Sequence, residues 1–176
     1  MNPDVIRHLV SMRKSPLHNY IVPGLTSWMI MDNGNLGKVR MFDCTREQHE
    51  LITPHSHRFD FTACVIEGGV ENTLWTPSSD GDDYQVTRTT YLNEPGKYES
   101  ELWQRDKFAT DVIAYDSGEW YGMKFNEIHS IKFHKGAKVL FFEGPAKVDC
   151  SYVLEPVVDG EHMKTMRTEP WMFKRG

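Results

Sequence analysis

Two histidines that stand one residue apart, His55 and His57, lie at the head of the apolar run 59–66. On an extended strand, side chains alternate between the two faces, so both imidazoles would point to the same side. A third histidine, His129, lies in a second β-like stretch, 128–133. Three neutral imidazoles suit iron, zinc, nickel, manganese or copper, and they leave coordination positions open. The spacing therefore predicts a catalytic metal site made by these three histidines.

The same alternation identifies the side chains that we expect beside the metal. Phe59 and Phe61 share the parity of the two histidines, so they should form an apolar wall in contact with the substrate. Arg58 and Asp60 have the opposite parity and should point away, unless a bulge intervenes.

Four polar residues are further candidates for catalysis or substrate binding. Glu127 shares the parity of His129 and is a candidate fourth ligand or base, the alternative being a turn residue that faces solvent. Tyr121 and Tyr152 are candidates for catalytic hydroxyl groups, and Arg40 for binding an anionic substrate. The simpler alternative for the last three is an ordinary surface or half-buried side chain.

Composition narrows the classes of partner. The net charge is −5, and the basic residues are scattered, which argues against nucleic-acid binding. No run approaches the roughly 20 apolar residues of a membrane helix, and no signal-peptide pattern opens the chain, so we expect a cytoplasmic protein without membrane contact.

The three cysteines have no C-x-x-C spacing, which argues against a disulfide framework and a thiolate zinc site. The 176 residues predict one domain, 1–176, as a monomer or homodimer.

The N-terminal residues 1–16 predict a short helix. Asn2, Pro3 and Asp4 supply a capping side chain, a proline at the first helical turn and a carboxylate at the positive end of the helix dipole. The pattern ends near Ser15-Pro16, and we expect this helix to pack on the outside of the fold that follows.

From Thr26 onward, short apolar segments separated by glycine, asparagine and proline predict strands joined by turns. Asn33-Gly34 predicts a hairpin between 27–31 and 38–43, residues 76–83 predict a solvated loop, and 106–108 a turn. This pattern, with almost no helix, predicts an all-β antiparallel fold that closes on itself. The other expected strands are 50–54, 57–67, 70–75, 85–92, 98–103, 120–123, 128–133, 138–143, 149–155 and 161–167, with turns at 93–96 and 159–160.

Two motifs resemble the paired motifs of the cupin superfamily. The first is Pro54-His55-Ser56-His57 followed by Val65–Gly69, and the second is the His129 strand with Glu143-Gly144-Pro145 after it. The resemblance implies a cupin-type antiparallel β-barrel, a double-stranded β-helix. Many cupins place a carboxylate ligand four or five residues after the second histidine, where this chain has Phe61 and Thr62.

Without that carboxylate, the chain resembles the three-histidine branch, and in particular the thiol dioxygenases that are similar to cysteine dioxygenase. This resemblance implies that His55, His57 and His129 bind Fe(II), with zinc, nickel or manganese as other possible metals. It further implies that a small thiol and dioxygen occupy the remaining coordination positions, and that the sulfur is oxidised to a sulfinate.

Three features of those enzymes are replaced in this chain. Ile21-Val22-Pro23 stands where they carry the arginine that binds an amino-acid carboxylate. Phe61 or Thr62 stands at their cross-linking cysteine, and the apolar run 139–143 replaces their Ser-x-His-x-Tyr relay. Two other functions therefore remain open: a metal-dependent isomerase, lyase or hydrolase, and a non-catalytic cupin that binds a ligand or serves as an assembly component.

Overall fold

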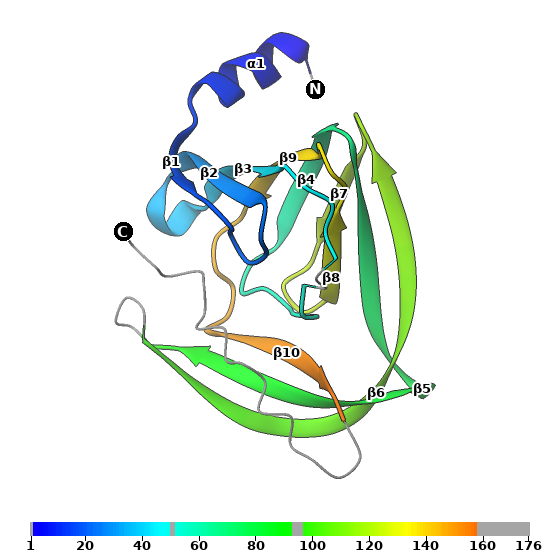
Figure 1. The fold of residues 1–176 in the computed structure, drawn as a ribbon. Helices are drawn as coiled ribbons and strands as arrows, with labels where there is room; N and C mark the ends of the chain where they lie inside the picture. The colour runs from blue at the N-terminus through cyan, green and yellow to red at the C-terminus, as the bar shows by residue number, and fades with distance from the viewer. Residues whose placement is uncertain (1, 50–51, 93–96, 158–176) are drawn as a thin grey trace.

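The computed structural model describes residues 2–49, 52–92 and 97–157, which form two antiparallel sheets and one short helix (Figure 1). One sheet has the strand order β1-β2-β3-β9-β4-β7, and the other has the order β10-β5-β6, with β8 paired to β5. The elements are α1 (Pro3–Ser11), β1 (Lys14–Leu17), β2 (Leu25–Asp32), the 3₁₀ turn η1 (Gly34–Leu36), β3 (Lys38–Cys44), β4 (Phe61–Glu67), β5 (Gly69–Tyr91), β6 (Tyr98–Asp116), β7 (Trp120–Met123), β8 (Ile128–Phe133), β9 (Lys138–Glu143) and β10 (Cys150–Pro156).

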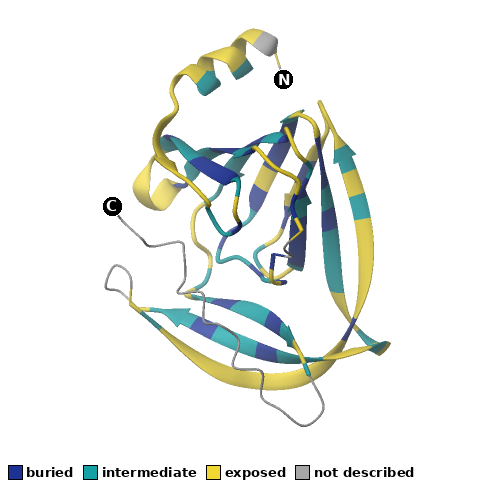
Figure 2. Ribbon diagram, in the orientation of Figure 1, coloured by how far each residue is buried: buried dark blue, intermediate teal, exposed yellow. Residues whose placement is uncertain are grey.

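The main apolar core lies between the two sheets. It combines Phe42 and Phe61 of the six-stranded sheet with Val70, Ile131 and Phe133 of the other sheet. In Figure 2 the buried residues gather where these sheets face each other, whereas most of β6 is exposed. The predicted fold class is therefore confirmed as an all-β antiparallel fold with one short helix, and the cupin-type barrel stays a prediction.

The six-stranded sheet is apolar on both faces. Along β9, Val139 and Phe141 contact the core between the sheets, whereas Leu140 and Phe142 belong to a second cluster on the opposite face. Because both faces are covered, this strand is a continuous apolar run instead of an alternating one.

The C-terminal end of helix α1 packs on the outer face of that sheet. Asn2 caps the helix as predicted, since its Oδ1 accepts a hydrogen bond from the Asp4 N–H at 2.8 Å. Leu9 and Val10 pack against the outer cluster. The helix ends at Ser11, earlier than predicted, because Ser15-Pro16 belongs to β1, an edge strand where a missing proline N–H is tolerated.

The predicted hairpin between β2 and β3 is confirmed, and its connection contains Gly34 with a φ of +60°. Strands β7, β8 and β9 match their predicted ranges, and β10 begins and ends one residue later than predicted.

The predictions for 76–83 and 106–108 are wrong. Both segments lie inside β5 and β6, which pair with each other over almost their whole length as a long arm (Figure 1), while β8 and β10 pair with the other edge of β5. Pro77 and Asp82 both face Phe108 in the ladder, so residues 78–81 form a bulge. Loop-type residues are tolerated there because the arm is exposed on one side and the bulge removes them from the ladder.

Two other strand predictions need correction. Residues 52–54 are not a strand, and β4 begins at Phe61 instead of at residue 57. Residues 50–51, the turn at 93–96, the turn at 159–160 and the strand at 161–167 lie outside the described residues. Among the described residues, no helix has the length and apolar character needed to cross a membrane.

Candidate metal centre

His55 and His57 precede β4 instead of lying inside it. The N–H of His55 donates to the His129 carbonyl at 2.8 Å, and the His129 N–H donates back to the His55 carbonyl at 3.0 Å. A second isolated bridge joins His55 to Val153 of β10. The short segment that carries the first two histidines therefore fills the space between β8 and β10, so the structure brings all three histidines together without the predicted regular strand.

The three imidazole rings converge on one point. One nitrogen of each ring can be chosen so that all three lie within 4.8 Å of one another. The Nε2 atoms of His57 and His129 are 2.9 Å apart. The ring centroid of His55 lies 4.8 Å from that of His57 and 5.0 Å from that of His129. Within the described part of the chain, no carboxylate or thiol belongs to this group. The donor set fits a borderline transition metal with open coordination positions.

Two hydrogen bonds fix which nitrogens face the centre. The Nδ1 of His55 lies 2.8 Å from the Thr53 carbonyl, and the Nδ1 of His129 lies 2.6 Å from the Asn72 Oδ1. A carbonyl oxygen can only accept, so each Nδ1 carries the proton and each Nε2 keeps a free lone pair. Asn72 is 1% exposed and comes from β5, so a residue far along the chain orients the imidazole of His129.

The surroundings keep the three rings neutral. Burial lowers the pKa of His55, and it lowers the pKa of His57 and His129 well below the usual histidine value, with the neighbouring histidines adding to the effect. Neutral imidazole is the form that binds a metal, so the site needs no deprotonation to accept one near neutral pH.

A cavity of about 130 Å³ opens beside the rings. Phe59, Phe61 and Phe141 form its apolar wall, and the ring centroids of Phe59 and Phe61 lie 5.2 and 4.9 Å from that of His57. The parity argument thus placed these two phenylalanines beside the histidines. Such a wall limits the access of water to the metal position.

Charged residues line another part of the same cavity. Arg40, Arg58 and Glu143 all contribute to it. Arg58 was expected to point away, but the segment before β4 is not a regular strand, so strict alternation does not hold there. Its guanidinium lies 4.2 Å from the Tyr91 ring centroid, and that of Arg40 lies 5.9 Å from the Tyr20 centroid. Arg40 and Arg58 therefore place two guanidinium groups in the cavity, although Ile21-Val22-Pro23 lacks the carboxylate-binding arginine of the thiol dioxygenases.

The acid–base groups of the cavity have shifted pKa values. Burial raises the pKa of the Glu143 carboxyl, although Arg40 and other nearby cations oppose the shift. Burial also raises the pKa of Tyr20 to about 12 and that of Tyr121 further. Both phenols are therefore neutral hydrogen-bonding groups near neutral pH.

The structure separates the three predicted catalytic residues. Tyr121 is buried, lines the histidine cavity and stacks on Tyr115 with 4.7 Å between ring centroids. Glu127 is exposed, and its Oε2 accepts a hydrogen bond from the Lys124 N–H at 2.6 Å. Tyr152 and Glu127 both line a different hollow, so neither is brought to the histidines. The reason is that Glu127 lies in the turn before β8 and closes that turn locally.

Sequence reasoning missed three residues of the site. Asn72 lies in the predicted strand 70–75 and Glu143 in the second motif, but the sequence assigned neither a role, and Arg58 was assigned to the wrong face. The available signal for Asn72 was its parity, because it shares a face of the strand with Val70 and Leu74, and a buried amide needs a hydrogen-bond partner.

No protein-family model and no curated protein matches the chain. Among solved structures it is similar to KdgF from a Halomonas species, at 12% identity and a TM-score of 0.43 over 74% of this chain and 88% of that one. It is also similar to an RmlC-like cupin from Shewanella frigidimarina, at 12% identity and a TM-score of 0.43 over 77% and 96% of the two chains. Substrate-bound ferrous HppE matches at 10% identity and a TM-score of 0.47, over 74% of this chain and 56% of that one. These weak likenesses carry no argument about chemistry, so the function has to come from the site itself.

Proposed function

We propose that this protein is a metal-dependent cupin enzyme, specifically a non-haem Fe(II) oxygenase of the thiol dioxygenase type that acts on a small anionic molecule. The observation that carries the proposal is the convergence of three neutral imidazoles, with no carboxylate in the group among the described residues. His55, His57 and His129 would hold the ion, and Thr53 and Asn72 would orient two of the ligands. When bound, Fe(II) supplies open coordination positions and the electron-transfer chemistry that dioxygen requires.

The cavity determines which substrate reaches that position. Phe59 and Phe61 exclude water from the histidine side, so a competing hydrolytic or radical side reaction is limited. Arg40 and Arg58 are suited to bind the anionic end of the substrate, because a guanidinium forms paired hydrogen bonds with a carboxylate. A volume of about 130 Å³ restricts the reacting part of the substrate to a few heavy atoms.

A second candidate function is a metal-dependent isomerase or lyase. The observation that favours it is Glu143, a cavity carboxyl whose pKa is raised by burial. A raised pKa brings a carboxyl closer to the range in which it can take up and return a proton during turnover. In this alternative Glu143 takes the role that the sequence suggested for Glu127.

Metal analysis and oxygen consumption distinguish these functions. The purified protein should bind close to one Fe(II) per chain, and the loaded protein should consume oxygen in the presence of a small carboxylated thiol. A protein that binds no transition metal would contradict both enzymatic proposals and leave the non-catalytic cupin. Stoichiometric metal without oxygen uptake across a thiol panel would favour the isomerase or lyase.

The role of Arg58 can be tested with matched substrates. Arg58→Met should raise the KM for a carboxylated thiol by about 10–100-fold, the cost of losing a charge-assisted hydrogen bond, and leave its uncharged methyl ester unaffected. Arg7→Met, on the exposed face of α1, is the control and should change neither value. Equal losses for the acid and the ester would mean that Arg58 does not recognise charge.

A further inference from the structure

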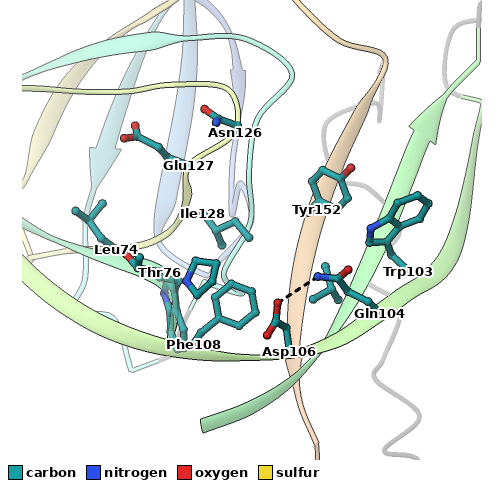
Figure 3. A pocket seen from close by; sticks show the side chains of 13 residues that line it. Leu74, Thr76, Trp103, Gln104, Asp106, Phe108, Asn126, Glu127, Ile128 and Tyr152 are labelled. Atoms are coloured by element: carbon teal, nitrogen blue, oxygen red, sulfur yellow. Dashed lines mark hydrogen bonds between the residues drawn. The ribbon is translucent and has the colours of Figure 1, made fainter. Parts of the chain in front are cut away.

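A second hollow, of about 420 Å³, is lined by residues of β5, β6 and β10 and of the turn that leads into β8 (Figure 3). Its walls combine aliphatic side chains with four aromatic rings, those of Trp75, Trp103, Phe108 and Tyr152. It is several times larger than the histidine cavity and shares no lining residue with it among the described residues. Hollows of this size typically hold a ligand or a group of side chains.

The charged groups of this hollow are acidic. Asp106 and Glu127 are among the lining residues, and within the described residues no lysine, arginine or histidine is. Asp106 accepts a hydrogen bond from the Gln104 side-chain amide at 3.3 Å (Figure 3). It accepts a second from the Lys107 N–H at 2.8 Å, and both donors are neutral. Aromatic walls with carboxylates at the edge suit an occupant that combines aromatic and cationic groups.

The last described residues of the chain lie at the edge of this hollow. The N–H of Val157 donates to the Asp83 carbonyl at 3.2 Å, and Asp83 faces Lys107 in the ladder, next to Asp106. Tyr84, which faces Pro156, packs its ring edge-on against Trp75 at 5.1 Å between centroids. The described part of the chain therefore ends, at Val157, within a few residues of the aromatic rings that line the hollow.

The sequence that follows contains the matching chemistry. Residues 171–175 read Trp-Met-Phe-Lys-Arg, which places two aromatic side chains and a methionine directly before two cations. The residues between, 158–170, span up to about 40 Å when extended, which is ample for a return to the adjoining hollow. A short tether of this kind gives an effective concentration in roughly the millimolar range, so modest contacts suffice for occupancy.

We propose that the C-terminal segment 171–175 docks in the hollow of its own chain, with its aromatic side chains against Trp75, Trp103 and Phe108 and its two cations beside Asp106 and Glu127. This inference is independent of the metal chemistry, because it uses none of the residues of the histidine cavity.

Amide hydrogen exchange of the full chain tests the proposal directly. In Trp171→Ala/Phe173→Ala, the amides of 103–108 and 126–128 should exchange about tenfold faster than in the unaltered protein, because the covering segment is released. The control Met163→Ala/Met166→Ala alters the same tail outside the segment and should leave both regions unchanged. Unchanged exchange in the Trp171→Ala/Phe173→Ala variant would overturn the proposal.

Charge reversal provides a second test that a general loss of stability does not reproduce. Asp106→Lys alone and Lys174→Glu/Arg175→Glu alone should each speed exchange at 103–108, and the combination should restore protection. The protection should also be the same after tenfold dilution. Protection that falls on dilution would show that the segment comes from a second copy of the chain, which contradicts docking within one chain.

Discussion

The histidine cavity and the aromatic hollow differ in how far along the chain His129, in the first, and the two carboxylates, in the second, find their hydrogen-bond partners. In the cavity, His129 forms a hydrogen bond with Asn72, which is 57 positions away in the sequence. It also approaches His57, which is 72 positions away. In the hollow, Asp106 bonds to residues one and two positions away, and Glu127 to a residue three positions away. Groups held by distant elements cannot move independently, so the cavity is suited to fix reacting atoms.

The side chains of Asp106 and Glu127, whose hydrogen-bond partners are close in the sequence, are less constrained in position than those of the histidine cavity. Most of β6 is exposed, including Leu102 at 56% and Trp103 at 50%, whereas the cavity wall includes Leu25 at 0%. An adaptable aromatic surface can bind a segment without the positional precision that a reaction needs. Under the two proposals made above, the histidine cavity would hold a metal ion and the hollow on the β5–β6 arm would bind a segment of polypeptide.

The largest expected effect is on the metal centre. His129→Ala removes one of three ligands and should lower metal affinity by more than about 100-fold, beyond the loss expected for an orienting residue alone. Metal content per chain after dialysis is the measurement, with His8→Ala in α1 as the control. Stoichiometric metal in His129→Ala would show that another residue completes the site.

A matched pair of leucine truncations compares the packing of the two regions. Leu25→Ala should lower the free energy of unfolding by about 2–5 kcal/mol, because a fully buried side chain leaves a void. Leu102→Ala on the exposed arm should cost less than about 1 kcal/mol. Chemical denaturation of both variants checks this, and similar losses would mean that the arm is covered as closely as the core.

The orienting role of Asn72 should be visible as a smaller effect. Asn72→Leu leaves the Nδ1–H of His129 without its acceptor, so metal affinity should fall by about 10–100-fold while the three ligands remain. Asn72→Asp restores an acceptor and should recover most of the affinity. Competition with a chelator measures the metal affinity of the unaltered protein and of both variants. Equal losses of affinity in the two variants would mean that Asn72 supports the packing of the site and does not orient His129.

The smallest effect concerns stability and pH. Because the pKa of Glu143 is raised in the folded state, the folded protein binds this proton more tightly than the unfolded chain does. The resulting stabilisation is present below the unfolded pKa of glutamate and is lost as the pH rises through the folded pKa. Glu143→Gln should therefore melt at a higher temperature than the unaltered protein near neutral pH, with the difference shrinking as the pH falls. A difference that does not change with pH would contradict this assignment.

Several features of the fold follow from local patterns in the sequence. The Asn2 cap, the Asn33-Gly34 connection and the ranges of β7, β8 and β9 depend on neighbouring residues, so they could be read without the tertiary structure. The long arm could not, because serine, aspartate and glycine at 78–81 look like a loop until the ladder on either side shows a bulge.

The site divides in the same way. Side-chain type and spacing were enough to identify the three histidines as candidate ligands and the flanking phenylalanines as an apolar wall. Only the tertiary structure decided that Glu127 and Tyr152 belong to another hollow and that Asn72 orients His129. The physical reason is that β5 and β8 meet through pairing between residues far apart in the chain, and no local pattern encodes which side chains that pairing brings into contact.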